Sequence, residues 1–102
     1  MISFEDAQAL RERKNREKRV RGRKYKKLLV KHLGGKCERC GYDRCLAGFD
    51  FHHIIPEEKE FSIGENCGNF AYGRLLKEVK KCMLLCANCH RELHYNEIEE
   101  ME

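Results

Sequence analysis

Apolar residues mark out a few short elements along the chain. Near the start, Ser3 is a candidate helix N-cap, and residues 4–10 place apolar side chains on one helical face. A second apolar patch at residues 28–33 is followed by Gly34-Gly35, which is a strong helix stop. We therefore predict a helix that ends near Leu33 and docks on the rest of the protein through its last turns.

The segment between these two patches has a different pattern. From residue 11 to residue 27 only Val20 and Tyr25 are large and apolar, while Lys or Arg occupies nearly every other position. Such a segment cannot gain stability by burying an apolar stripe. We expect it to be helical only where phosphate groups neutralise its self-repulsion.

The middle of the chain predicts a strand followed by loops. In residues 47–55, Phe49 and Phe51 alternate with polar side chains, as in a half-buried strand, and Pro56 ends the pattern. Residues 57–64 predict a charged loop, with a short extended piece as an option near its end. A further loop is expected at residues 66–69, where Gly and Asn cluster.

The last third of the chain predicts a helix, a strand and a second helix. Apolar residues at helical spacing predict a helix over 70–81, and the run at 83–85 predicts a short buried strand. Residues 86–96 predict a tight turn that continues into a helix. The Glu-rich tail, residues 97–102, is expected to fray.

Composition indicates one small domain with a separate basic arm. A chain of 102 residues cannot bury a large core, so a metal, disulfides or a partner must stabilise it. Residues 1–36 carry a net charge of +9 and residues 37–102 a net charge of −5. This asymmetry favours a polyanionic partner for the arm, and the alternative is a solvated or disordered charge run. No signal peptide or membrane-length apolar run is visible, so a reducing cytoplasm is the expected compartment and no membrane partner is expected.

Seven cysteines include two Cys-x-x-Cys pairs, Cys37 with Cys40 and Cys86 with Cys89. The odd count and the pairing favour metal over a disulfide framework. Each pair can chelate one ion from a tight turn, and Gly41 permits the left-handed backbone of such a turn. Four cysteines satisfy tetrahedral Zn²⁺ and leave no open position, so we predict a structural zinc site.

The three other cysteines, at positions 45, 67 and 82, are expected to be buried as small hydrophobic residues. Cys45 is an alternative to Cys40 as a ligand, although its spacing from Cys37 fits poorly.

Four of the five histidines fall in two places, His52-His53 at the end of the predicted strand and His90 with His94 in the last helix. His90 and His94 are four residues apart and therefore share a helix face, which suits binding of one divalent ion. The alternative is that they are ordinary polar surface residues. Neighbouring side chains on a strand point to opposite faces, so His52 and His53 act at one site only if the backbone bends, and Ile54-Ile55-Pro56 is where we expect that bend.

Three motifs follow one another in a fixed order: Cys-x-x-Cys-Gly from residue 37, Phe-His-His-Ile-Ile-Pro from residue 51 with Lys59 close behind, and Leu-Leu-Cys-Ala-Asn-Cys-His-Arg-Glu-Leu-His from residue 84. With the three motifs in this order, the segment 33–95 resembles the zinc-knuckle branch of the HNH endonucleases, a family common in phages and bacteria. The resemblance implies an α+β, ββα-metal fold, in which a hairpin carrying the catalytic histidine packs on a helix carrying metal ligands. It implies hydrolysis or nicking of DNA by an enzyme located in the cytoplasm, or in the host cytoplasm if it is phage-encoded.

The resemblance also implies roles for the histidines. His53 would be the general base that activates the attacking water. His52 and His90 would be ligands of a catalytic Mg²⁺, Mn²⁺ or Ni²⁺ ion, and His94 a further metal or phosphate contact that only some branches have. Neutral imidazole, with a pKa of about 6.5, can accept a proton from water at neutral pH.

The chain departs from the family pattern at the middle Asn of the motif. That Asn would fall near Lys81, where no Asn is present. In relatives it braces the loop that bears the general base. Asn66, Asn69 and Asn88 are the candidates to replace it.

The resemblance divides the chain into a basic helical arm at 1–33, a nuclease domain at 34–96 and the acidic tail. The arm is poor in Asn, Gln and aromatic residues, which suits counterion release from the DNA backbone rather than base reading. The predicted DNA-binding residues are Arg11, Arg13, Lys14, Arg16, Lys18, Arg19, Arg21, Arg23, Lys24, Lys26 and Lys27.

The principal alternative function is a zinc-ribbon module that binds nucleic acid without catalysis. Such a module would keep the four cysteines and the arm but has no need of four histidines in register with them. A zinc deaminase and a zincin are excluded, because their His-x-Glu and His-Glu-x-x-His motifs are absent.

Overall fold

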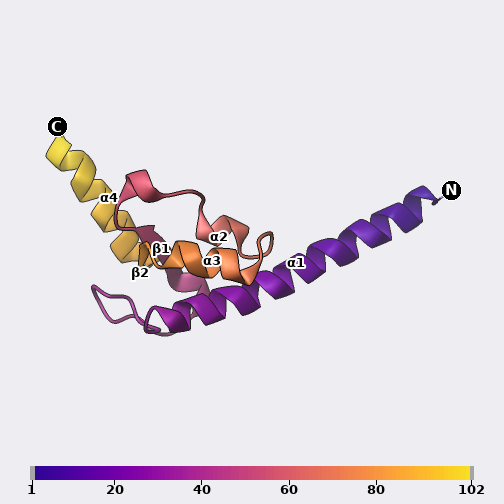
Figure 1. The fold of residues 1–102 in the computed structure, drawn as a ribbon, viewed down its shortest axis with the longest axis horizontal. Helices are drawn as coiled ribbons and strands as arrows, with labels where there is room; N and C mark the ends of the chain where they lie inside the picture. Colours follow the sequence, from indigo (N-terminus) through magenta and orange to yellow (C-terminus); the bar gives the residue numbers. More distant parts are fainter. Residues whose placement is uncertain (1, 102) are drawn as a thin grey trace.

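The computed structural model describes residues 2–101, and the side chains of residues 2–98. This part of the chain is a small α+β fold with four α-helices and one two-stranded antiparallel sheet (Figure 1). In chain order the elements are α1 (Phe4–His32), β1 (Phe49–His53), α2 (Ile63–Asn66), α3 (Tyr72–Val79), β2 (Cys82–Cys86) and α4 (Ala87–Met101).

The sheet forms the centre of the domain. Strands β1 and β2 pair from Phe49 opposite Cys86 to His53 opposite Cys82. Leu84 and Leu85 in β2 are both fully buried, because the two faces of this strand are covered by different parts of the fold. Leu84 packs in a cluster with Val30 of α1, whereas Leu85 lies in a cluster with three buried cysteines, Cys37, Cys86 and Cys89.

Helix α1 begins and ends where the sequence predicts. The Ser3 hydroxyl accepts a hydrogen bond of 3.1 Å from the Asp6 backbone N–H, which caps the first turn. After His32 the chain leaves the helix through Gly34 and Gly35, whose φ angles of 101° and 74° favour glycine. The predicted helix stop is therefore confirmed.

The second half of α1 packs on the domain, while its N-terminal half projects away (Figure 1). Leu29 is fully buried in the core cluster beneath α3, and the rings of Tyr25 and Tyr72 lie 5.4 Å apart. Further out, Arg21 donates through Nε and Nη2 to the Gly68 carbonyl at 3.2 and 2.6 Å. The projecting helix makes the molecule 58 Å long but only 30 by 23 Å across.

Residues 11–27 lie within this one uninterrupted helix, although their sequence predicts helix only beside phosphate. Close backbone packing contributes to its order. A Cβ atom added at Gly68 would lie 2.6 Å from the Lys18 carbonyl oxygen, so α1 and the loop at Gly68 are in direct contact. Tertiary contacts from residue 18 onward therefore stabilise the helical conformation of a segment whose own apolar residues are too few to do so.

Several predicted boundaries were wrong by a few residues. The expected strand at 47–55 is shorter, since Leu46–Gly48 forms a 3-10 helix and only Phe49–His53 pairs with β2. The expected helix at 70–81 is limited to Tyr72–Val79. The strand predicted at 83–85 extends by one residue at each end, where backbone pairing continues beyond the apolar run.

The segments expected to be irregular contain local helix. The charged loop at 57–64 begins with a 3-10 helix at Pro56–Glu58, and the four residues of α2 span the border between the two predicted loops. Helix α4 continues to Met101, past Glu97 where the helix was expected to fray. These elements lack an apolar stripe long enough for periodicity to detect.

Candidate metal centres and cleft

The four predicted zinc ligands come together at the junction of three elements. Cys37 and Cys40 follow the end of α1, Cys86 is the last residue of β2, and Cys89 lies in the first turn of α4. Their sulfur atoms all lie within 4.8 Å of one another, and those of Cys40 and Cys86 are 3.6 Å apart. Tetrahedral Zn²⁺ with bonds of about 2.3 Å needs sulfur atoms about 3.8 Å apart. The cluster can therefore hold a metal ion such as zinc.

Backbone geometry favours a thiolate at Cys37, whereas side-chain hydrogen bonds among the sulfur atoms raise the pKa of Cys40 and of Cys89 above the ordinary value. Gly41 has a φ of 80°, which confirms the predicted left-handed turn after Cys40. Burial alone would raise the pKa of Cys37, but backbone hydrogen bonds from Cys86, Cys40 and Arg39 outweigh it and lower the pKa to about 6. The Cys89 backbone N–H lies 3.4 Å from the Cys86 sulfur. N–H groups directed at sulfur stabilise the charged form that metal binding requires.

The remaining cysteines lie outside this cluster. Cys67 and Cys82 are buried, as expected, and burial raises the pKa of both thiols, that of Cys82 to about 12. Cys45 is exposed, so its predicted burial is wrong. It follows the turn at Tyr42, whose hydroxyl accepts from the Cys45 backbone N–H at 3.2 Å, and the ligand set includes Cys40 instead.

A second cluster joins His52 of β1 to His90 and His94 of α4. One ring nitrogen from each of the three lies within 4.8 Å of the other two. The Nε2 atoms of His90 and His94 are 3.0 Å apart, and the ring of His52 lies 5.3 and 5.5 Å from theirs. The structure thus brings together the three histidines that the sequence predicts as ligands of a divalent ion.

Asp50 orients this cluster, and sequence reasoning missed it. The Nδ1 atom of His90 lies 3.0 Å from the Asp50 carboxylate. A carboxylate in this position accepts a hydrogen bond from the Nδ1–H group and so leaves the Nε2 lone pair free for a metal. Asp50 is two residues before His52 and therefore on the same strand face, which was the available signal.

His52 is held in the neutral form that a metal ligand requires. Burial lowers its pKa below the ordinary value, and positive charge on His90 and His94 lowers it further. Three imidazoles this close repel one another when protonated. A divalent ion held by their nitrogen atoms fits the donor set, because imidazole suits several transition metals.

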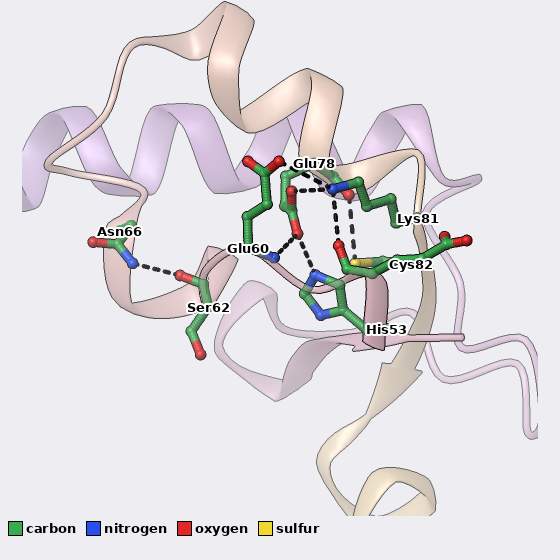
Figure 2. A network of polar contacts seen from close by, with 8 residues as sticks. His53, Glu60, Ser62, Asn66, Glu78, Lys81 and Cys82 are labelled. Atoms are coloured by element: carbon green, nitrogen blue, oxygen red, sulfur yellow. Dashed lines mark hydrogen bonds and ion pairs between the residues drawn. The ribbon is translucent and has the colours of Figure 1, made fainter. Parts of the chain in front are cut away.

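His53 points into the protein on the other face of the strand. It is 7% exposed, and its Nε2 atom lies 2.8 Å from Glu78 Oε2 of α3 (Figure 2). The strand pairing is regular through His53, and the chain bends directly after it at Ile54 and Ile55, where the sequence suggests a bend. His52 and His53 both line one cleft, although their side chains leave opposite faces of β1.

Glu78 and Lys81 brace the loop that follows His53. Oε2 of Glu78 accepts from the Glu60 backbone N–H at 3.1 Å, and Lys81 Nζ donates to the Glu58 carbonyl at 2.9 Å (Figure 2). The backbone N–H of Ile54 donates to the Lys81 carbonyl at 3.1 Å. Lys81 therefore braces this loop from the position near which the expected Asn is missing.

The three Asn residues considered as replacements have other positions. Asn66 donates to the Ser62 carbonyl at 2.8 Å, at the start of α2, and Asn69 to the Glu65 carbonyl at 3.4 Å. Asn88 is exposed in the first turn of α4. The bracing residue that sequence missed is Glu78, a charged residue on the apolar stripe of α3 with Leu75 and Val79.

The histidines line an open cleft of about 420 Å³ between β1, α4 and the loop after β1. Lys26 of α1 and Lys59 of the loop also line it. Of the predicted DNA-binding residues, Lys26 is therefore next to the histidines, and Arg21 is engaged with Gly68. The side chains from Arg11 to Arg19 are all exposed on the projecting half of α1.

Comparison with known proteins adds no relative. No protein-family model, curated protein or solved structure matches this chain. Within residues 2–101, every helix is too short or too polar to cross a membrane.

Proposed function

We propose that this chain is a small metal-dependent endonuclease that hydrolyses DNA phosphodiester bonds, as the zinc-knuckle HNH enzymes it resembles do. One observation carries the proposal: three histidines suited to one divalent ion share a cleft with a fourth histidine whose Nε2 is held by a buried carboxylate. A ligand set and a general base at one cleft are the parts that metal-assisted hydrolysis needs.

His52, His90 and His94 would hold the divalent ion, which is distinct from the structural zinc. The four-cysteine site is closed, so it offers no position for water or phosphate. An ion bound by the histidines would stabilise negative charge on the scissile phosphate and on the leaving 3′ oxygen. Asp50 keeps the His90 ring in the orientation that presents Nε2.

His53 would act on the attacking water. Its Nδ1 accepts a proton as the water oxygen forms a bond to phosphorus and the bond from phosphorus to the 3′ oxygen breaks. His53 belongs to no ligand cluster among the described residues, so its imidazole is free for this role. General bases of this kind contribute about 10²–10⁴-fold to the rate.

Basic side chains that reach the cleft from α1 and from the loop after β1 support a polyanionic substrate, although the carboxylates of Asp50 and Glu65 also line it. Lys26 and Lys59 line the cleft beside the histidines, and the exposed basic face of α1 continues outward from it. Phosphate contacts of this kind position a nucleic acid without reading its sequence. The alternative, a zinc-ribbon binding module, accounts for the cysteines and α1 but gives no reason for the carboxylates that support His90 and His53.

Cleavage of supercoiled plasmid by zinc-loaded protein tests the proposal. With added Mg²⁺, Mn²⁺ or Ni²⁺ we expect nicked or linear product, and chelation of the added metal should stop the reaction. His53→Ala should lower the rate about 10²–10⁴-fold. It should stay folded, because Glu78 keeps Lys81 and the Glu60 N–H as donors. His32→Ala, at the end of α1, is the matched control and should cleave normally.

His90→Ala should lose cleavage by a different route, through weaker binding of the divalent ion, and excess metal should partly restore it. His94→Ala should follow the same pattern. Cleavage by His53→Ala at the rate of the His32→Ala control would remove the proposed base. No cleavage by the unaltered protein with any of these metals would favour the binding module.

A further inference from the structure

We propose that Glu78 is a positioning residue for His53: its carboxylate holds the imidazole in the tautomer with the proton on Nε2, which leaves Nδ1 as the acceptor facing the cleft. The inference deepens the proposed function, on which its catalytic meaning rests. The tautomer of His53 can be measured without substrate.

The position of Glu78 is unusual for a carboxylate. The residue is 2% exposed and lies on α3 between Leu75 and Val79, both fully buried. A buried carboxylate is costly unless donors surround it. Here Oε1 accepts from Lys81 Nζ at 2.9 Å, while Oε2 accepts from the Glu60 backbone N–H at 3.1 Å and lies 2.8 Å from His53 Nε2 (Figure 2).

These contacts determine which ring nitrogen carries the proton. Burial alone would raise the pKa of Glu78, but hydrogen bonds from Lys81, from the Glu60 backbone and from His53 outweigh it and lower the pKa to about 2. At neutral pH the carboxylate is therefore ionised and can only accept. Nε2 of His53 must be the donor, and in neutral imidazole the lone pair is then on Nδ1.

The geometry leaves Nδ1 open. Every fully buried side-chain nitrogen or oxygen of the described residues has a hydrogen-bond partner, yet Nδ1 of His53 has none within residues 2–98. It is therefore reached by solvent, and His53 lines the cleft. Figure 2 shows this second ring nitrogen facing away from Glu78.

Bracing of the loop after β1 is the competing explanation for Glu78. A brace would need only the contacts with Lys81 and the Glu60 N–H, and it would be indifferent to the His53 tautomer. Glu60 provides the matched control, because its exposed carboxylate lies 3.9 Å from the same Lys81 ammonium and makes no contact with His53 among the hydrogen bonds of this network. A positioning role for Glu78 predicts a change in the His53 tautomer when Glu78 is replaced, whereas a bracing role predicts a change in stability alone.

The experiment is a long-range ¹H–¹⁵N spectrum of the full chain with labelled histidine and stoichiometric zinc, at about pH 8, where imidazole is ordinarily neutral. We expect His53 in the Nε2–H tautomer. In Glu78→Gln the Nδ1–H tautomer should become populated, because an amide can donate as well as accept. Glu60→Gln should leave the His53 signals unchanged.

Either of two spectra would overturn the proposal: His53 of the unaltered protein in the Nδ1–H form, or Glu78→Gln with the tautomer fully retained. Should Glu78→Gln not fold, the unaltered protein and Lys81→Met decide the question. Loss of the Lys81 donor should leave Glu78 as an acceptor and keep the Nε2–H form, and a change of tautomer there would assign the control to Lys81 instead.

Plasmid cleavage then connects the tautomer to catalysis. Glu78→Gln should lower kcat about 10²–10⁴-fold with KM and divalent-metal affinity unchanged. Glu60→Gln should cleave at the normal rate. If the unaltered protein does not cleave DNA, the proposed function fails while the tautomer result stands; if it cleaves and Glu78→Gln cleaves equally well, the positioning role fails alone.

Discussion

Replacing Cys89 by Ser removes one of the four clustered sulfur atoms that can hold zinc. The effect can be gauged from the small core around them. Apart from Cys37, Cys86 and Cys89, the buried part of this cluster is Leu85 alone. Burial of one Leu contributes about 1.5–3 kcal/mol, whereas structural zinc contributes about 10–16 kcal/mol in small zinc domains.

A domain of this size has a total stability of about 5–15 kcal/mol. Loss of the zinc contribution therefore exceeds what the rest of the fold can offset, and we expect Cys89→Ser to be largely unfolded near its metal site. Three measurements on the variant test this expectation: its zinc content, its circular dichroism spectrum and its denaturant unfolding curve. Cys45→Ser is the matched control: Cys45 is exposed and outside the cluster, so its loss should change stability by less than about 0.5 kcal/mol. A Cys89→Ser protein that binds no zinc yet melts like Cys45→Ser would refute the reasoning.

Two further predictions concern α1. Changing Arg11, Arg13, Lys14 and Arg16 together to Gln should weaken DNA binding equally for all sequences and should flatten the slope of log K against log salt by up to about 0.9 per lost phosphate contact; an unchanged slope would exclude these residues from the interface. Gly68→Ala should cost about 1–3 kcal/mol in denaturant unfolding, because the new Cβ would meet the Lys18 carbonyl at 2.6 Å. Gly73→Ala, where nothing lies within 4 Å, should not destabilise, and equal behaviour of the two variants would contradict the packing of α1 on this loop.

The parts of the site carried by short-range spacing could be predicted from sequence. Two Cys-x-x-Cys pairs identify their own ligand set, since the spacing itself fixes the turn geometry. The four-residue interval between His90 and His94 likewise defines one helix face. The proximity of His52 to these two histidines could not be predicted from spacing, because it depends on the strand pairing between Phe49 and Cys86 that places β1 beside α4.

The residues that support the histidines could not be found in the same way. Asp50 and Glu78 act through contacts with partners 40 and 25 residues away, which no local pattern encodes. Each left a weaker trace: Asp50 shares the strand face of His52, and Glu78 interrupts an apolar stripe. A charged residue at a core position is a sign of a buried polar network and is a useful flag in a chain of this kind.

The accuracy of the predicted element boundaries was limited for the same reason, because long-range contacts decide where an element ends. The strand predicted at 47–55 lost its ends because ladder pairing, which is a tertiary property, decides where a strand stops. Residues 11–27 are helical without phosphate, contrary to what their composition predicts, and Gly22, Tyr25 and Leu29 pack the second half of α1 against the domain. Local composition describes such a segment correctly as polar and still misjudges its order.

Cys89 and His90 are consecutive residues of the first turn of α4, so one helix start sets the geometry of both candidate metal centres. If the cysteine cluster holds zinc, oxidation of its thiolates to a disulfide would release the ion and remove its hold on this turn. A shift of a single residue turns a helical side chain by about 100° and moves it about 1.5 Å along the axis, enough to separate His90 from Asp50 and His52. Oxidative damage at a site that touches no substrate would thus disable the histidine cluster, and a thiol reductant together with zinc would be needed to restore it.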